Sequence, residues 1–215
     1  MLSTLMHRWQ FAFKANGFRT KIIVSTSFLL LYAFIAPIIF EFIQQRNGYI
    51  LSDYVLLHLP ALNLSLPIFT LLYFLIASSI LVFIFHPKSF LLTLVAYVIL
   101  TTLRFSTILL VPLDPPLNIV ELHDPFVQFF FYQQTVTKDL FFSGHTSILV
   151  LFALTIPYKH VRPLLLIGAG IIGFMLLIQH AHYTIDILFA PLFAWLSVTL
   201  AKMKGGRNQP NTNDL

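Results

Sequence analysis

Long apolar runs constrain this chain more than any other feature of its sequence. A helix that crosses a bilayer needs about 20 apolar residues in succession, and six runs near that length occur here. Only 10% of the residues are charged, whereas a water-soluble domain carries about 25%. We therefore predict an all-α, polytopic membrane protein with six transmembrane helices. They are expected at residues 21–42, 66–85, 90–111, 141–158, 163–179 and 183–201.

The same pattern predicts a single domain. Residues 1–204 are expected to form one six-helix transmembrane domain, and the polar residues 205–215 a disordered tail. The first apolar run is longer than the 7–15 residues of a typical signal-peptide core, so we expect it to remain as a helix. The sequence has no cysteine, which excludes disulfides and thiol chemistry.

The distribution of Lys and Arg predicts the orientation of the helices. Of the 13 Lys and Arg residues, Arg46 and Lys138 fall at one set of helix ends, and Arg104 falls inside a run. The others lie at the opposite ends: Arg8, Lys14, Arg19, Lys21, Lys88, Lys159, Arg162, Lys202, Lys204 and Arg207. Because basic residues favour the cytoplasmic side, we expect both termini in the cytoplasm. Topology and lipid headgroups then explain the net charge of +5, without a nucleic-acid partner.

Two long segments are expected on the outer side, at residues 41–65 and 112–140. The second contains a cluster of aromatic residues that would suit a helix lying in the membrane interface. Its members are Phe126, Phe129, Phe130, Phe131 and Tyr132. They would serve either as aromatic anchors or as one wall of a path for lipids.

Unusual polar residues collect at the outer boundary. His145 begins the fourth predicted helix and His182 the sixth, so both are expected at the same depth. Asp186 follows His182 by four positions, which places both on one helix face. Asp186 can accept a hydrogen bond from one imidazole nitrogen and leave the other as a nucleophile or base. Arg104 is expected near this level, because it lies about two turns below the outer end of the third helix.

The residues around His145 suit an anion. Ser143 is predicted to cap the fourth helix, and Gly144 leaves room for another group to approach the backbone. The free amides of a helix start favour negative charge, and His145 could donate a proton to a leaving oxygen. Arg104 and Lys138 could neutralise a phosphate.

Other interpretations of these residues stay open. A metal site is one, because His and Asp suit zinc; its ligands would be His145, His182, Asp186 and Asp139. Arg104 could instead bind a backbone carbonyl or Asp114. We predict a structural role for His180, because its position two residues before His182 points it elsewhere.

Two motifs carry a family resemblance. Residues 137–146 read TKDLFFSGHT, and residues 182–187 read HYTIDI. They resemble the motifs C-G-D-x-x-x-S-G-H-T and H-Y-T-x-D-[VI] of the sphingomyelin synthase branch of the lipid phosphate phosphatase superfamily. Thr137 and Lys138 replace the Cys and Gly of the first motif. Residues 103–112, LRFSTILLVP, are weakly similar to an upstream motif of that branch.

The resemblance implies a membrane enzyme without a metal or other cofactor. His182 would be the nucleophile that forms a phosphohistidine, Asp186 would orient it, and His145 would act as acid and base. Supporting roles are implied for three further residues: Asp139, Thr146 and Tyr183. The substrate would be a phospholipid or lipid phosphate. With a lipid alcohol as acceptor the enzyme would be a phosphotransferase, and with water a phosphatase or phospholipase C-type hydrolase.

The sequence departs from the other branches of that superfamily in its basic residues. Their K-x6-R-P motif is not found in this sequence. Residues 159–163, KHVRP, are similar in composition, but their spacing is wrong and they are expected on the cytoplasmic side. The phosphate site is therefore expected to be poor in positive charge. We expect it to face the periplasm or exterior of a bacterial inner membrane.

A non-enzymatic channel, transporter or assembly factor is the alternative of another class. An ion path would need ionisable residues through the whole bilayer, and a transporter would show paired broken helices. The sequence instead collects its ionisable residues at one side, apart from Arg104.

Overall fold

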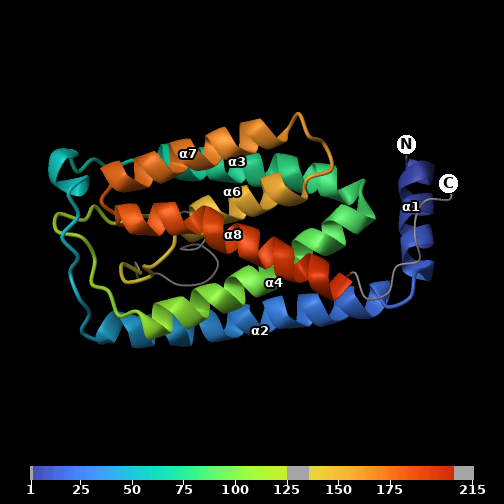
Figure 1. Cartoon of the computed structure of the whole chain (residues 1–215), viewed down its shortest axis with the longest axis horizontal. Coiled ribbons are helices and arrows are strands. Elements are labelled where there is room, and N and C mark those ends of the chain that lie inside the picture. Colours follow the sequence, from blue (N-terminus) through green and yellow to red (C-terminus); the bar gives the residue numbers. More distant parts are fainter. Residues whose placement is uncertain (1, 125–135, 206–215) are drawn as a thin grey trace.

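The structure, a computed structural model, describes residues 2–124 and 136–205. Its regular elements in these residues are helices, which confirms the predicted all-α class. They are α1 (Leu2–Lys14), α2 (Phe18–Gln45), the 3-10 helix η1 (Leu56–His58), α3 (Ser65–Ile84), α4 (Pro87–Leu110), α6 (Gly144–Thr155), α7 (Arg162–Ile178) and α8 (Thr184–Gly205). Figure 1 shows the helices from α2 to α8 running lengthwise in one bundle, with α1 across one end.

Helices α6 and α8 form the centre of the bundle. α6 packs against α7 and α8. α8 also packs against α4, and α4 lies between α8 and α2. Small residues on α8 allow this close packing: Ala190, Ala194, Val198 and Ala201 are buried. At Gly173 on α7 an added Cβ would lie 2.7 Å from Ile187 Cγ2. The starts of α6 and α8 are therefore held at the same end of a tightly packed core.

The helix lengths support the prediction of six crossings only in part. In the described residues α2, α3, α4 and α8 are long and apolar enough to cross a membrane, whereas α6 has 12 residues and α7 has 17. At about 1.5 Å per residue, α6 is much shorter than the roughly 30 Å of a hydrocarbon core. The helices indicate an integral membrane protein, but six full-length crossings are not confirmed.

Two local features explain why α6 is shorter than the predicted run at residues 141–158. The Ser143 side chain caps its first turn by accepting a hydrogen bond from the amide of Thr146. Before the cap, Phe141 and Phe142 have positive φ angles of 67° and 45°, outside the helical region. At the other end Ile156 is extended, as expected for a residue that precedes proline.

Helix α1 was not predicted from the sequence. This amphipathic helix is attached to the end of α3, where Trp9 Nε1 donates to the carbonyl of Ile84 at 2.8 Å. Arg8 donates to the carbonyl of Phe85 at 2.9 Å. These bonds satisfy carbonyl groups that the last turn of a helix leaves without partners, so α1 closes this end of the bundle.

The two ends of the bundle differ in charge as the sequence predicted. The connections α3–α4 and α6–α7, with α1 and the end of α8, gather at the end that carries most of the basic residues (Figure 1). The opposite end, which we call the outer end, is formed by the other connecting segments. These are residues 46–64, 111–124, 136–143 and 179–183. The sides of the membrane that they face stay a prediction. The predicted aromatic helix at 126–132 and the tail beyond residue 205 lie outside the described residues.

Backbone pairing and an arginine join the segments of the outer end. Tyr49 pairs with the segment after α4, donating to Pro112 O at 2.9 Å and accepting from the amide of Asp114 at 3.0 Å. Arg46 donates to the carbonyls of Ile108 and Leu109 in the last turn of α4. The first outer segment is thus fixed to the end of α4.

Gly48 permits this pairing, and its replacement provides a test. An added Cβ there would lie 2.5 Å from the carbonyl carbon of Leu113 and 2.6 Å from the amide nitrogen of Asp114, both backbone atoms. We expect Gly48→Ala to destabilise the protein by about 1–3 kcal/mol, measured by thermal unfolding in detergent. Gly170→Ala is the matched control, because an added Cβ there has no neighbour within 4 Å. Equal stability of the two variants would contradict the close approach.

Candidate active site

A histidine and an aspartate form the buried centre of the candidate site. His182 Nδ1 lies 3.1 Å from Asp186 Oδ2, and the exposed fractions of the two residues are 3% and 0%. Asp186 lies on the first turn of α8, and His182 lies two residues before that helix begins. The sequence predicted this pair on one helix face. The contact is present, but His182 reaches it from the segment that leads into α8.

Asp186 also fixes the turn that precedes α6. Its Oδ1 accepts a hydrogen bond from the amide of Phe141 at 3.2 Å, and its backbone carbonyl accepts from the amide of Ser143 at 2.9 Å. Oδ2, which contacts His182, also accepts from the amide of Tyr183 at 3.0 Å. One carboxylate thus joins the segment before α8 to the segment before α6.

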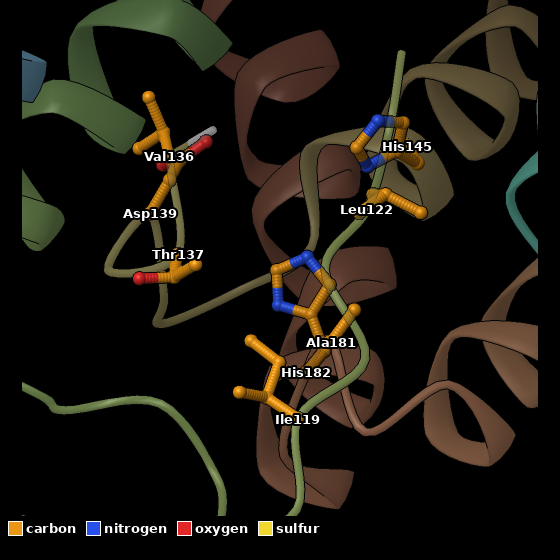
Figure 2. Close-up of a pocket in the computed structure, with 8 residues that line it drawn as sticks. All are labelled: Ile119, Leu122, Val136, Thr137, Asp139, His145, Ala181 and His182. Carbon is orange, nitrogen blue, oxygen red and sulfur yellow. The ribbon is translucent and has the colours of Figure 1, made fainter. Parts of the chain in front are cut away.

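His145 and His182 line one cavity. Their ring centres are 6.5 Å apart, and His145 packs edge-on against Phe69 of α3 at 5.6 Å. Figure 2 shows the two rings across the cavity from Thr137 and Asp139. The cavity has a volume of about 40 Å³, and His145 Nδ1 is buried without a hydrogen-bond partner in the described part of the chain. The three residues predicted to act together are therefore neighbours at one end of the bundle.

The residues beside His145 shape the start of α6. Ser143 is fully buried and caps the helix, as predicted. Thr146, whose amide donates to the Ser143 side chain, is buried, and an added Cβ at Gly173 of α7 would lie 3.5 Å from its hydroxyl oxygen. The positive φ angles of Phe141 and Phe142 are unusual for non-glycine residues, and such backbone strain often occurs at functional sites.

Arg104 has an ion-pair partner that the sequence did not identify. Its Nη2 lies 2.7 Å from Asp139 Oδ2, and its Nη1 donates to the carbonyl of Phe142. Of the two structural partners considered, a backbone carbonyl is observed, but the carboxylate is Asp139 and not Asp114. Gly144 allows the approach, because an added Cβ would lie 3.0 Å from Arg104 Nε. The group for which Gly144 leaves room is therefore this guanidinium.

Lys138 is also paired. Its Nζ lies 2.7 Å from Asp114 Oδ1 and donates to the carbonyl of Arg46. The hydrogen bond from Lys138 lowers the pKa of Asp114, although partial burial acts in the opposite direction. Both cations predicted to bind phosphate thus already contact carboxylates, and their role toward a substrate stays a prediction.

Two further predicted residues have structural contacts. The ring nitrogens of His180 lie 3.1 Å from the carbonyl of Leu117 and 3.2 Å from that of Leu59, so this histidine connects two outer segments. The Tyr183 hydroxyl donates to the carbonyl of Asp114 and accepts from the amide of Leu51. Within residues 2–124 and 136–205, no three His, Cys, Asp or Glu side chains are arranged to hold a metal ion.

Two residues of the site region were not predicted from the sequence. Asp53 contacts Thr184 at the start of α8. Gln179 is fully buried and bonds to Ser65, Leu64 and the carbonyl of Glu121. Gln179 could have been noticed as an uncharged polar residue at the end of an apolar run. Asp53 lies in a polar segment, where an aspartate carries no distinguishing signal.

Comparison with known families supports part of the resemblance. Residues 138–203 match the family model "PAP2 superfamily C-terminal". The matched region contains His145, His182 and Asp186, and it supports a relationship to the lipid phosphate phosphatase superfamily. It does not distinguish the sphingomyelin synthase branch within that superfamily. A search of curated proteins found no match.

The Arg104–Asp139 pair can be tested by a double-mutant cycle. We expect Arg104→Gln and Asp139→Asn each to lower the free energy of unfolding by about 1–3 kcal/mol, because each leaves a partly buried partner uncompensated. The double variant should be less destabilised than the sum of the two, with a coupling of about 0.5–3 kcal/mol. Thermal unfolding in detergent measures the cycle. Strict additivity would show that the pair does not hold residues 136–143 on α4.

Proposed function

We propose that this protein is a membrane enzyme that acts on a lipid phosphate ester through a phosphohistidine, with the site on the extracytoplasmic face. The observation that carries the proposal is the His182–Asp186 pair, with His182 and His145 lining one cavity, within the segment that matches the PAP2 superfamily. An oriented imidazole with one nitrogen uncommitted is a suitable nucleophile. A second imidazole nearby can act as acid and base.

In the first step, His182 Nε2 attacks phosphorus. A bond forms between nitrogen and phosphorus while the bond to the leaving lipid oxygen breaks, and protonated His145 gives its proton to that oxygen. Asp186 holds Nδ1 and stabilises the positive charge that develops on the ring. The ring centres are 6.5 Å apart, which suits one phosphate making contacts of about 3 Å with each ring.

In the second step, an acceptor hydroxyl gives its proton to His145, now neutral. The acceptor oxygen then bonds to phosphorus, the nitrogen–phosphorus bond breaks, and its electron pair returns to His182. A lipid alcohol as acceptor makes the reaction a phosphotransfer similar to that of sphingomyelin synthase. Water as acceptor makes it a hydrolysis.

The charges around the cavity favour a phosphate diester as substrate. Arg104 and Lys138 are each neutralised by a carboxylate, so the doubly charged phosphate of a monoester would find little compensation. A diester carries one negative charge, and the first amides of α6 can stabilise it. This balance supports transfer of a phospho-headgroup to a lipid alcohol over hydrolysis of a lipid monophosphate.

Substrate binding requires the cavity to enlarge. Its volume of about 40 Å³ is room for only a few water molecules, since about 10–15 Å³ of such volume holds one, and it is far below the roughly 300–1,000 Å³ of a pocket that encloses a small molecule. His145 and His182 are held at helix starts, whereas Ile119, Leu122, Val136 and Thr137 line the cavity from irregular segments. We infer that these segments move when the substrate enters.

The discriminating assay supplies a labelled phosphocholine lipid to purified protein, with and without ceramide or diacylglycerol. Transfer of label to the added alcohol supports the phosphotransferase. Release of free phosphocholine or phosphate alone supports the hydrolase. A parallel arm with a lipid monophosphate tests the charge argument, because turnover of the monoester above that of the diester would contradict it.

The nucleophile and its partner are tested by His182→Ala and Asp186→Asn. We expect both to reduce turnover at least about a thousandfold, because the nucleophile is lost or its tautomer is wrong. His160→Ala is the matched control, since this exposed histidine lies in the α6–α7 connection, which is at the opposite end of the bundle (Figure 1). Full activity of the His182→Ala protein would refute the mechanism. Ion or proton flux in liposomes that survives this substitution would favour a transporter.

His145 is tested with two leaving groups. We expect His145→Ala to reduce turnover of a natural lipid by a factor of about 10²–10⁴, the usual contribution of a general acid. The leaving group of a p-nitrophenyl phosphodiester needs no proton. With this substrate, His145→Ala should reduce the rate of phosphoenzyme formation much less. Rapid-quench measurement of that first step separates the two substrates. Equal losses would show that His145 does not protonate the leaving oxygen.

A further inference from the structure

We propose that Asp53 is a positioning residue that holds the start of α8 and so sets the geometry of the His182–Asp186 pair. The inference rests on the proposed function for its kinetic consequences. Asp53 lies in the first outer segment, far from the site in sequence, and is partly buried. The matched family segment begins at residue 138, so Asp53 acts on that segment from outside it.

The Asp53 carboxylate connects two parts of the chain. Oδ2 accepts a hydrogen bond from the amide of Thr184 at 2.6 Å, and Oδ1 accepts from the Thr184 hydroxyl at 2.9 Å. Oδ1 also accepts from the amides of Val55 and Leu56 at 3.0 and 3.3 Å. One side chain therefore fixes both its own turn and the first residue of α8.

Helix α8 needs such a partner because of its sequence. The residue before it, at the capping position, is Tyr183 and not the Ser, Thr, Asp or Asn that usually supplies a side-chain acceptor there, and its hydroxyl donates to the carbonyl of Asp114. Asp186 accepts from the amide of Tyr183, which is one half of a capping box. Asp53 supplies the acceptor for the following amide from a distant segment. Its negative charge also suits the positive end of the helix dipole.

The position of Thr184 links this contact to the chemistry. Thr184 is midway between His182 and Asp186, and His182 precedes the helix. The distance from Nδ1 of His182 to the carboxylate of Asp186 therefore depends on the backbone of residues 182–184, and regular helical hydrogen bonding does not fix it. A misplacement of about 1 Å can reduce an enzymatic rate by about a hundredfold.

The electrostatic state of Asp53 fits this role. Burial raises the pKa of its carboxyl, but the hydrogen bonds from Thr184, Leu56 and Val55 outweigh burial and lower the pKa below its usual value. The carboxylate thus stays ionised, and able to accept all four hydrogen bonds, at neutral pH.

Asp53→Asn is the most informative variant. An amide has one oxygen, which can keep the turn with Val55 and Leu56, while its NH2 group would then face the amide of Thr184, donor against donor. Thr184→Ser keeps both bonds to Asp53, and Thr184→Val keeps the amide bond alone. Ser52→Ala, at the exposed neighbour, is the matched control.

We expect Asp53→Asn to lower kcat at least about tenfold with little change in KM, because a misplaced nucleophile affects the chemical step. The kcat of Thr184→Val should lie between those of Asp53→Asn and the wild type. The kcat values of Thr184→Ser and Ser52→Ala should equal that of the wild type. Hydrogen exchange provides a readout independent of activity. In Asp53→Asn, peptides covering residues 180–190 should exchange faster, while those from α3 and α7 should not.

The outcomes separate this inference from the proposed function. If the wild-type protein turns over lipid and Asp53→Asn has the same kcat, the inference is overturned and the proposed function is left intact. Faster exchange throughout the protein with a general loss of stability would also overturn it, because the effect would not be specific to α8. If the wild-type protein turns over no lipid, the proposed function fails. Hydrogen exchange then decides whether Asp53 holds the start of α8, and unchanged exchange overturns that role.

Discussion

The interactions of the Asp186 carboxylate organise the candidate site. It contacts His182 and accepts hydrogen bonds from the amides of Phe141 and Tyr183. A fully buried carboxylate is tolerated only when such donors compensate for its lost hydration. The same bonds that satisfy the charge therefore bring together the segments before α6 and α8; His145 follows the first of these segments, on the first turn of α6, and His182 lies in the second. Stability and site geometry depend here on one group.

The ion pairs at the outer end have a different role. Arg104 joins residues 139–142 to α4, and Lys138 joins the same segment to Asp114. These contacts position the segment before α6 from its outer side, while Asp186 holds it from within. Because the cations are used in this way, a phosphate bound as proposed would depend mainly on the first amides of α6 for its stabilisation. The arrangement accounts for a site that is close to arginine and lysine yet contains little uncompensated positive charge.

The sequence predicted the features that depend on local patterns. The positions of the six apolar helices, the Ser143 cap and the proximity of His182 to Asp186 all follow from periodicity, capping preference or short spacing. Features set by distant contacts were missed or assigned wrongly. The carboxylate beside Arg104 is Asp139 and not Asp114, because the turn before α6 brings it closer. Asp53 was missed, since its contact with Thr184 joins residues 131 positions apart. The length of α6 was overestimated, because the helix is shorter than the apolar run that contains it.

The short α6 has a consequence for where the chemistry can take place. A helix of 12 residues spans about 18 Å, whereas α4 and α8 have 24 and 22 residues. His145, on the first turn of α6, lines its cavity together with Ile119, Leu122 and Thr137 of the outer segments, so these segments cover the imidazole. A reactive ester bond is close to the headgroup of a lipid, so a site beneath these segments can receive it with the acyl chains still in the bilayer. The shortened helix is therefore compatible with the proposed lipid substrate, and the cap at Ser143 and the turn at Phe141 and Phe142 set where it begins.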